Sequence, residues 1–209
     1  MPRFAAIAAS ALVVVLLAVG TLYALLPRGD EDVFAQCREA QVAGGSIGGP
    51  FELQDKTGAT VTDADVITGP SLVYFGYTFC PDVCPLDNAR NVQAVDILAE
   101  RGMEVSPVFI SIDPNRDTPE IVGEFAENLH ERMIGLTGTP AQVKAASQAY
   151  KTYYAVNGDT SDPYYLVDHS TLTYLVFPQA GFVEFFRRDL TPEQLADRVG
   201  CFVAAAAGL

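Results

Sequence analysis

The sequence predicts an α/β domain preceded by one apolar segment at the N-terminus. Residues 71–77 (SLVYFGY) and 104–112 (EVSPVFISI) are apolar runs rich in β-formers, typical of strands buried on both faces. Residues 88–101, between them, place apolar side chains at helical spacing. Residues 4–26 carry no charged side chain at all. Strand, helix and strand in this order indicate a layered α/β domain, and the uncharged run lies outside it.

The composition excludes several classes of protein. The chain has 209 residues, with 13 Lys and Arg against 26 Asp and Glu, which gives a net charge of -13. Binding to a phosphate backbone needs clustered basic side chains, so nucleic acid is not an expected partner. A hydrophobic content of 49% is too high for a disordered chain. Four Cys are too few for a small disulfide scaffold, but they suffice for one redox or metal pair and one structural bridge.

Residues 1–27 are expected to form an N-terminal membrane anchor. As a helix, residues 4–26 would span about 34 Å at about 1.5 Å per residue, enough for a hydrocarbon core of about 30 Å. A cleaved signal peptide usually has a shorter apolar run, roughly 7–15 residues, followed directly by its cleavage site. A cleaved signal peptide is the alternative, but the weak cleavage signal at Val33-Phe34-Ala35 lies well past the apolar run.

The charges around this segment predict its orientation. Arg3 and the N-terminal amine precede it, whereas the acidic residues 30–32 follow it. The excess of positive charge before the segment places the N-terminus in the cytoplasm. We therefore expect a single pass through the inner membrane, a linker over residues 28–46, and a domain over residues 47–209 in the periplasm or the intermembrane space. Disulfides persist in such compartments.

The domain is expected to open with a β-hairpin. Residues 48–50 (GGP) are a turn signal, and residues 51–53 alternate like a short strand. Thr57-Gly58 predicts the turn before a second short strand at residues 60–62.

The strand–helix–strand unit of residues 71–112 is followed by two helices. Residues 117–120 (DTPE) supply a capping side chain, a Pro in the first turn and an acid favoured by the helix dipole. They predict a helix that ends near residue 129. Thr139-Pro140 opens another helix, which ends near residue 150.

The last part of the domain predicts strands and a terminal helix. Residues 165–167 and 172–177 are strand-like, and residues 182–186 return after a turn. Thr191-Pro192-Glu193 caps a helix that ends near residue 205. A strand–helix–strand unit followed by a hairpin and a terminal helix is typical of a thioredoxin-like fold, with helices on both faces of one sheet.

Cys80 and Cys84 form a C-x-x-x-C pair between the strand at residues 71–77 and the following helix. The free amides and the dipole of a helix N-terminus stabilise a thiolate there. Thioredoxin-type enzymes use C-x-x-C, and the extra residue suits two soft ligands on one ion without forbidding a disulfide. Two thiolates prefer soft metals such as Cu(I) or Zn(II).

The chain has two histidines that could add a third ligand. His130 ends a predicted helix beside Glu131 and Arg132, which favours a solvated helix end. His169 lies between two strand-like segments, where a ligand and a buried structural histidine are equally reasonable. Two sulfurs and one nitrogen suit Cu(I), or Cu(II) with a further donor, whereas a structural zinc site needs a fourth protein ligand.

Four segments together resemble the Sco/SenC family of membrane-anchored copper proteins. They are residues 74–85 (YFGYTFCPDVCP), 111–120 (SIDPNRDTPE), 165–170 (YLVDHS) and 185–188 (FFRR), and they occur in the family's order. The resemblance implies a thioredoxin-like fold used for copper delivery. It also implies that the metal ligands are Cys80, Cys84 and His169, with one copper ion, Cu(I) or Cu(II), per chain.

The resemblance further implies a biological role. Family members assist assembly of the dinuclear copper (CuA) centre in subunit II of cytochrome c oxidase, so this subunit is the expected partner. Another periplasmic copper chaperone is a candidate second partner. The leading hypothesis is a metallochaperone that turns nothing over. The alternative is a membrane-anchored thiol-disulfide oxidoreductase in which Cys80 and Cys84 are the redox pair. A peroxidase fits less well, because the Pro-x-x-x-Thr/Ser-x-x-Cys pattern is missing. His169 discriminates the two leading functions, because only the copper site needs it.

Four further residues carry expectations of their own. Asp168 is a candidate to orient or tune the site, although adjacent strand residues face opposite sides. Asp82 is either a turn residue or an electrostatic tuner of the cysteines. Cys37 and Cys201 are expected to form a disulfide that ties the linker to the last helix. Its alternative is two unpaired cysteines, with Cys201 buried as a small hydrophobe. Residues 113–120 are read as a turn and a helix cap rather than as a docking site for the partner.

Overall fold

The computed structural model describes residues 16–17, 21, 32–38 and 47–207. Most of the predicted anchor and linker, over residues 1–46, therefore lies outside the described residues, and the predicted membrane-spanning helix is not confirmed. Among the helices that are described, none is long and apolar enough to cross a membrane. The domain boundaries at residues 27 and 46 stay predictions. The compact unit considered below begins at Phe34.

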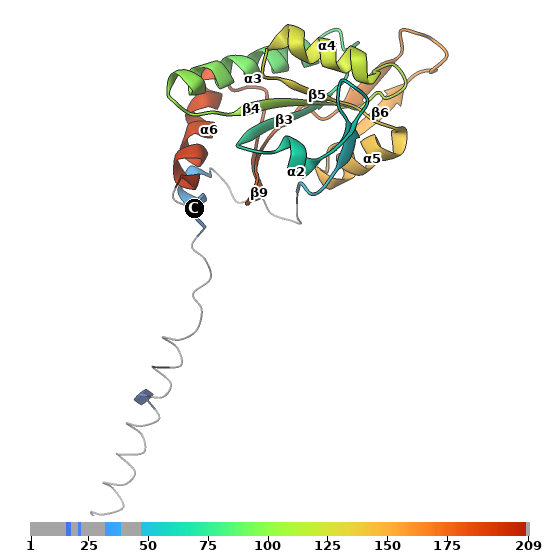
Figure 1. Ribbon diagram of the computed structural model, residues 1–209. Helices are drawn as coiled ribbons and strands as arrows, with labels where there is room; N and C mark the ends of the chain where they lie inside the picture. Colours follow the sequence, from blue (N-terminus) through green and yellow to red (C-terminus); the bar gives the residue numbers. More distant parts are fainter. Residues whose placement is uncertain (1–15, 18–20, 22–31, 39–46, 208–209) are drawn as a thin grey trace, which may run out of the picture. The chain divides into compact units, whose positions relative to one another are not determined.

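The centre of the domain is a five-stranded sheet with the strand order β5-β4-β3-β8-β9 (Figure 1). Strands β3, β4 and β5 run parallel, and β8 runs antiparallel to both β3 and β9. The central strand β3 is buried at every position, as its continuous apolar sequence predicts. The strand bounds are β3 (Ser71–Gly76), β4 (Ser106–Ser111), β5 (Ile134–Leu136), β8 (Thr173–Phe177) and β9 (Gly181–Phe186).

Four longer helices complete the layers: α3 (Val83–Glu100), α4 (Pro119–Leu129), α5 (Pro140–Ala149) and α6 (Pro192–Ala206). Three of them start at the Thr-Pro pairs noted in the sequence. The side chains of Thr118, Thr139 and Thr191 accept the amide of the third helical residue, and Pro occupies the first turn. Figure 1 shows α3 and α4 on one side of β3, β4 and β5, with α5 on the other. This arrangement is the thioredoxin-like α/β fold that the sequence predicts.

The smaller elements flank this sheet. The predicted hairpin is present as β1 (Glu52–Gln54) and β2 (Thr60–Thr62), and Gln54 bridges to Thr137. A separate two-stranded sheet pairs β6 (Tyr154–Asn157) with β7 (Leu166–His169). The strand expected at residues 165–167 is therefore not part of the main sheet. The sequence analysis missed β5, β6, the short helix α2 (Asp63–Val66) and the 3-10 turn η1 (Ala35–Cys37).

A disulfide joins Cys37 of η1 to Cys201 of α6, with their Cα atoms 5.8 Å apart. It is the pairing expected from the sequence, and both cysteines are therefore unavailable as metal ligands. Phe34, just before η1, packs against the rings of Phe177 and Phe202 at centroid distances of 5.5 and 5.7 Å. The segment before the domain is thus fixed to the last helix by a covalent bond and by aromatic packing.

Candidate metal centre

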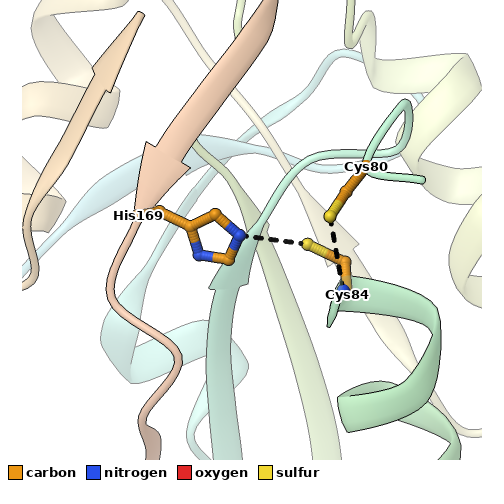
Figure 2. Close-up of side chains that lie close together, drawn as sticks. All are labelled: Cys80, Cys84 and His169. Atoms are coloured by element: carbon orange, nitrogen blue, oxygen red, sulfur yellow. Dashed lines mark hydrogen bonds between the residues drawn. The ribbon is translucent and has the colours of Figure 1, made fainter. Parts of the chain in front are cut away.

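Cys80 and Cys84 lie where β3 meets α3 (Figure 2). Cys80 is in the connecting loop, and Cys84 is the second residue of the helix, because the helix starts at Val83. The backbone amide of Cys84 donates to the sulfur of Cys80 at 3.4 Å. Cys80 is 9% exposed and Cys84 is fully buried. The pair therefore has one sulfur near the surface and one beneath it.

His169 is the last residue of β7, and its ring points at the two cysteines (Figure 2). Its Nε2 lies 3.3 Å from the Sγ of Cys84. Its Nδ1 lies 2.8 Å from the carbonyl oxygen of Ser170, which accepts a hydrogen bond from an Nδ1–H group. That tautomer leaves the lone pair of Nε2 facing the sulfurs, the arrangement in which histidine binds metals.

The three side chains fit one soft metal ion. One ligand atom from each of Cys80, Cys84 and His169 lies within 4.8 Å of the other two. Bonds of about 2.0 Å to nitrogen and about 2.3 Å to sulfur would place trigonal ligands about 3.5–4 Å apart. The side chains therefore need to close by only a fraction of an ångström or so. Two sulfurs and one nitrogen are a donor set that suits Cu(I).

Two tyrosine rings stand perpendicular to the imidazole of His169. Tyr74 and Tyr77 have ring centroids 6.2 and 5.9 Å from it. The hydroxyl of Tyr74 donates to Asp87 at 3.0 Å, and that of Tyr77 accepts from the amide of Val167 at 3.3 Å. Both rings are thereby fixed at their far ends, and they restrict the orientation of the histidine. The sequence analysis did not assign them a role. The signal available was their place in the run that leads into Cys80.

Gly76, the last residue of β3, makes room for the buried sulfur. A Cβ atom at this position would lie 2.8 Å from the Sγ of Cys84 and 3.0 Å from ring atoms of Phe109 and Tyr74. Real Cβ atoms do not approach other atoms so closely, and the surrounding rings are held in a dense core. Glycine is therefore required for Cys84 to lie against the end of the strand.

The two thiols differ in their tendency to ionise. The Cys84 side chain and the backbone amides of Asp82 and Cys84 stabilise the Cys80 thiolate, which outweighs burial and lowers the pKa of the Cys80 thiol to about 4. The neighbouring Cys80 sulfur, together with burial, raises the pKa of Cys84. Cys80 thus carries the negative charge first, as expected for a thiol beside a helix N-terminus.

The segment after β4 supports the cysteine loop, which we define as residues 77–80. Asp117 accepts the amide of Thr78 at 3.0 Å and its hydroxyl at 2.5 Å. Asp117 also accepts the hydroxyl of Ser111 at 2.5 Å. Burial raises the pKa of Asp117. The sequence analysis identified the helix cap in this segment correctly but missed its contact with the cysteine loop.

The other predicted site residues lie as follows. Asp168 and Asp82 are both exposed. The imidazole of His169 bonds to the carbonyl of Ser170, and what Asp82 provides to Cys80 is its backbone amide. Tuning roles for the two carboxylates stay predictions. His130 caps the end of α4, as predicted, and lies 3.0 Å from the carboxylate of Asp96, but its side chain is only 13% exposed and therefore not solvated as expected.

Comparison with known proteins gives consistent matches over most of the chain. The sequence profile described as SCO1/SenC matches residues 39–204. Protein SenC of Rhodobacter capsulatus is 56% identical over 204 residues, covering 97% of this chain and 91% of that protein. The crystal structure of Arabidopsis thaliana ScoI with copper bound has a TM-score of 0.71 at 38% identity, covering 78% of this chain and 99% of that one. For yeast Sco1 with copper bound the TM-score is 0.71 at 33% identity, covering 77% and 90%.

Proposed function

The chain belongs to the SCO1/SenC family, and from this premise we propose that it is a copper-binding metallochaperone. Copper is the cargo, and Cys80, Cys84 and His169 hold one ion per chain. The observation that carries the proposal is the convergence of three ligand atoms within 4.8 Å. Solved structures of the Arabidopsis and yeast relatives contain copper, which supports the choice of metal.

The proposed acceptor is the CuA centre in subunit II of cytochrome c oxidase. Proteins of this family assist the assembly of that centre. A site with one nearly buried and one fully buried cysteine holds Cu(I) away from bulk water, yet Cys80 is 9% exposed and offers a route for ligand exchange. We further propose that residues 4–26 anchor the domain on the periplasmic or intermembrane-space side of the membrane. Their uncharged run supports this location.

A second candidate function is reduction of the acceptor's cysteines. The different burial of Cys80 and Cys84 favours it, because a dithiol reductant attacks with an accessible thiolate and resolves with a protected one. Cys80 would attack one sulfur of the acceptor disulfide and release the other as a thiolate. Cys84 would then attack Cys80 and release the acceptor dithiol. The two electrons pass to the acceptor, and this chain is left with a Cys80–Cys84 disulfide, which an external thiol donor must reduce.

A complementation experiment separates the two functions. Cells that lack this gene receive the wild-type chain, Cys80→Ser, Cys84→Ser, His169→Ala or the matched control His130→Ala. The copper content of oxidase subunit II is then measured. Copper delivery predicts that all variants fail except His130→Ala. Loss confined to the two cysteine variants would reject copper delivery in favour of the reductase, and full activity of all variants would reject both.

A further inference from the structure

The cysteines and the histidine of the metal centre come from parts of the fold that do not share a β-sheet. The cysteine loop extends from β3 in the main sheet, whereas His169 ends β7 in a separate two-stranded sheet. Hydrogen bonding in the main sheet therefore does not set the distance from His169 to Cys84. Some other contact must hold β7 and the segment before it against the cysteine loop.

Arg116 binds the segment that leads into β7. Its Nη1 donates to the carbonyl oxygens of Pro163 at 3.1 Å and of Tyr165 at 2.9 Å. Its guanidinium carbon lies 3.6 Å from the ring centroid of Tyr165. The hydroxyl of Tyr165 in turn donates to Asp113 at 2.5 Å. Four contacts thus tie residues 163–165 to the turn that carries Arg116.

The same guanidinium also contacts the cysteine loop. It lies 4.8 Å from the ring centroid of Phe79, which directly precedes Cys80, and 5.7 Å from that of Tyr77. Its Nε donates to Asp113 at 2.6 Å. The Arg116 side chain is 19% exposed and the Asp113 side chain only 2%, so this ion pair is shielded from water. Partly desolvated cations over aromatic faces are attracted more strongly than exposed ones.

We propose that Arg116 is a positioning residue that locks the cysteine loop to the strand carrying His169. The planar fork of arginine bonds to Asp113, Pro163 and Tyr165 together while its face packs on aromatic rings. The single ammonium of lysine cannot reproduce this geometry, so Arg116→Lys fails although it keeps the charge. The copper-binding test of this inference rests on the proposed function. The contacts of Arg116 themselves do not require a metal.

Amide hydrogen exchange of the full, reduced, metal-free chain tests the lock. The variants are Arg116→Gln, Arg116→Lys and the milder Asp113→Asn. Arg101→Gln is the matched control, because Arg101 pairs with Asp197 on the exposed surface. Loss of one charge-assisted hydrogen bond corresponds to about tenfold or more in an equilibrium. Both Arg116 variants are expected to exchange at least about tenfold faster at the amides of Thr78 and Val167, with a smaller effect for Asp113→Asn.

Copper binding gives the second readout. Both Arg116 variants are expected to bind copper at least about tenfold more weakly, and the nitrogen signature of His169 in the Cu(II) spectrum should weaken. Faster exchange at only one of the two amides, or exchange equal to that of Arg101→Gln, overturns the lock. If wild-type chain binds no copper, the proposed function fails, while the exchange result still decides the lock. Normal copper binding by the Arg116 variants would reject the role of Arg116 in positioning the metal ligands, but not the contact between the two segments that hydrogen exchange detects.

Discussion

The Nε2 of His169 lies 3.3 Å from the Sγ of Cys84, although the two residues are 85 positions apart in the chain. Cys84 lies in the first turn of helix α3 and His169 ends strand β7, so their meeting depends on the turn between β3 and α3 and on the end of β7. The approach is close enough for one soft ion to bridge them with little movement. The chemistry proposed for this chain depends on that relationship and on the side chains that maintain it.

The first prediction concerns the space for the buried sulfur. Gly76→Ala is expected to push Cys84 away, because the new Cβ atom would lie 2.8 Å from its sulfur. Overpacking of this kind typically destabilises a core by about 1–3 kcal/mol. We expect copper affinity to fall with it. The matched control is Gly69→Ala, where a Cβ atom meets no atom within 4 Å. Competition titration with a copper chelator should separate the two variants, and equal affinities would reject the steric role of Gly76.

The second prediction concerns pH and Asp117. Burial raises the pKa of this carboxyl in the folded chain. Because the pKa is raised, the contribution of Asp117 to stability is fully present below its pKa in the unfolded chain, about 3.9. This contribution is lost as pH rises through its pKa in the folded chain. The free energy of unfolding of wild type minus that of Asp117→Asn should therefore decrease as pH rises from about 4 toward neutrality.

Urea unfolding of both chains at several pH values measures this difference. Because all other titrating groups are shared, their effects cancel in the subtraction to first order. A difference that stays constant or grows with pH would show that Asp117 is ionised without penalty in the folded chain.

The third prediction concerns the disulfide. Cys37 and Cys201 are 164 positions apart, and the chain-entropy relation assigns about 5 kcal/mol to a loop of this length. Cys37→Ser with Cys201→Ser should lower the free energy of unfolding by about 3–5 kcal/mol. Copper stoichiometry should be unchanged, because Cys37 belongs to a core cluster separate from that of Cys80 and Cys84. Loss of copper binding in a chain that remains folded would contradict this separation.

Much of the fold could be predicted because its signals are local. The Thr-Pro pairs set the starts of three helices, and the apolar run at residues 71–77 gave the central strand. Strand β5 was missed because its three residues, Ile134-Gly135-Leu136, are too few to show a period, and no hairpin turn signal frames them as Thr57-Gly58 does for the equally short β1 and β2. It forms through its pairing with β4, which the sequence alone does not display.

The candidate site divides in the same way. Cys80 and Cys84 were identified by their spacing before a helix, and His169 by the resemblance to the Sco/SenC family. Gly76 and Arg116 escaped notice because their roles arise from contacts between distant segments. The contact of Arg116 with Tyr165 joins residues 49 positions apart, and no local pattern indicates it. Sequence reasoning found the candidate ligands, whereas only the structure reveals what positions them.

The most direct test of the metal centre is copper binding by the reduced full chain. Bound copper per chain and the Cu(II) thiolate absorption are measured for wild type, Cys80→Ser, Cys84→Ser and His169→Ala, with His130→Ala as the matched control. The account predicts about one copper per chain in wild type and in His130→Ala, from the one three-ligand group among the described residues. It predicts altered or lost absorption in the other three variants. Negligible binding by wild type, or binding indifferent to His169, would contradict the proposed centre.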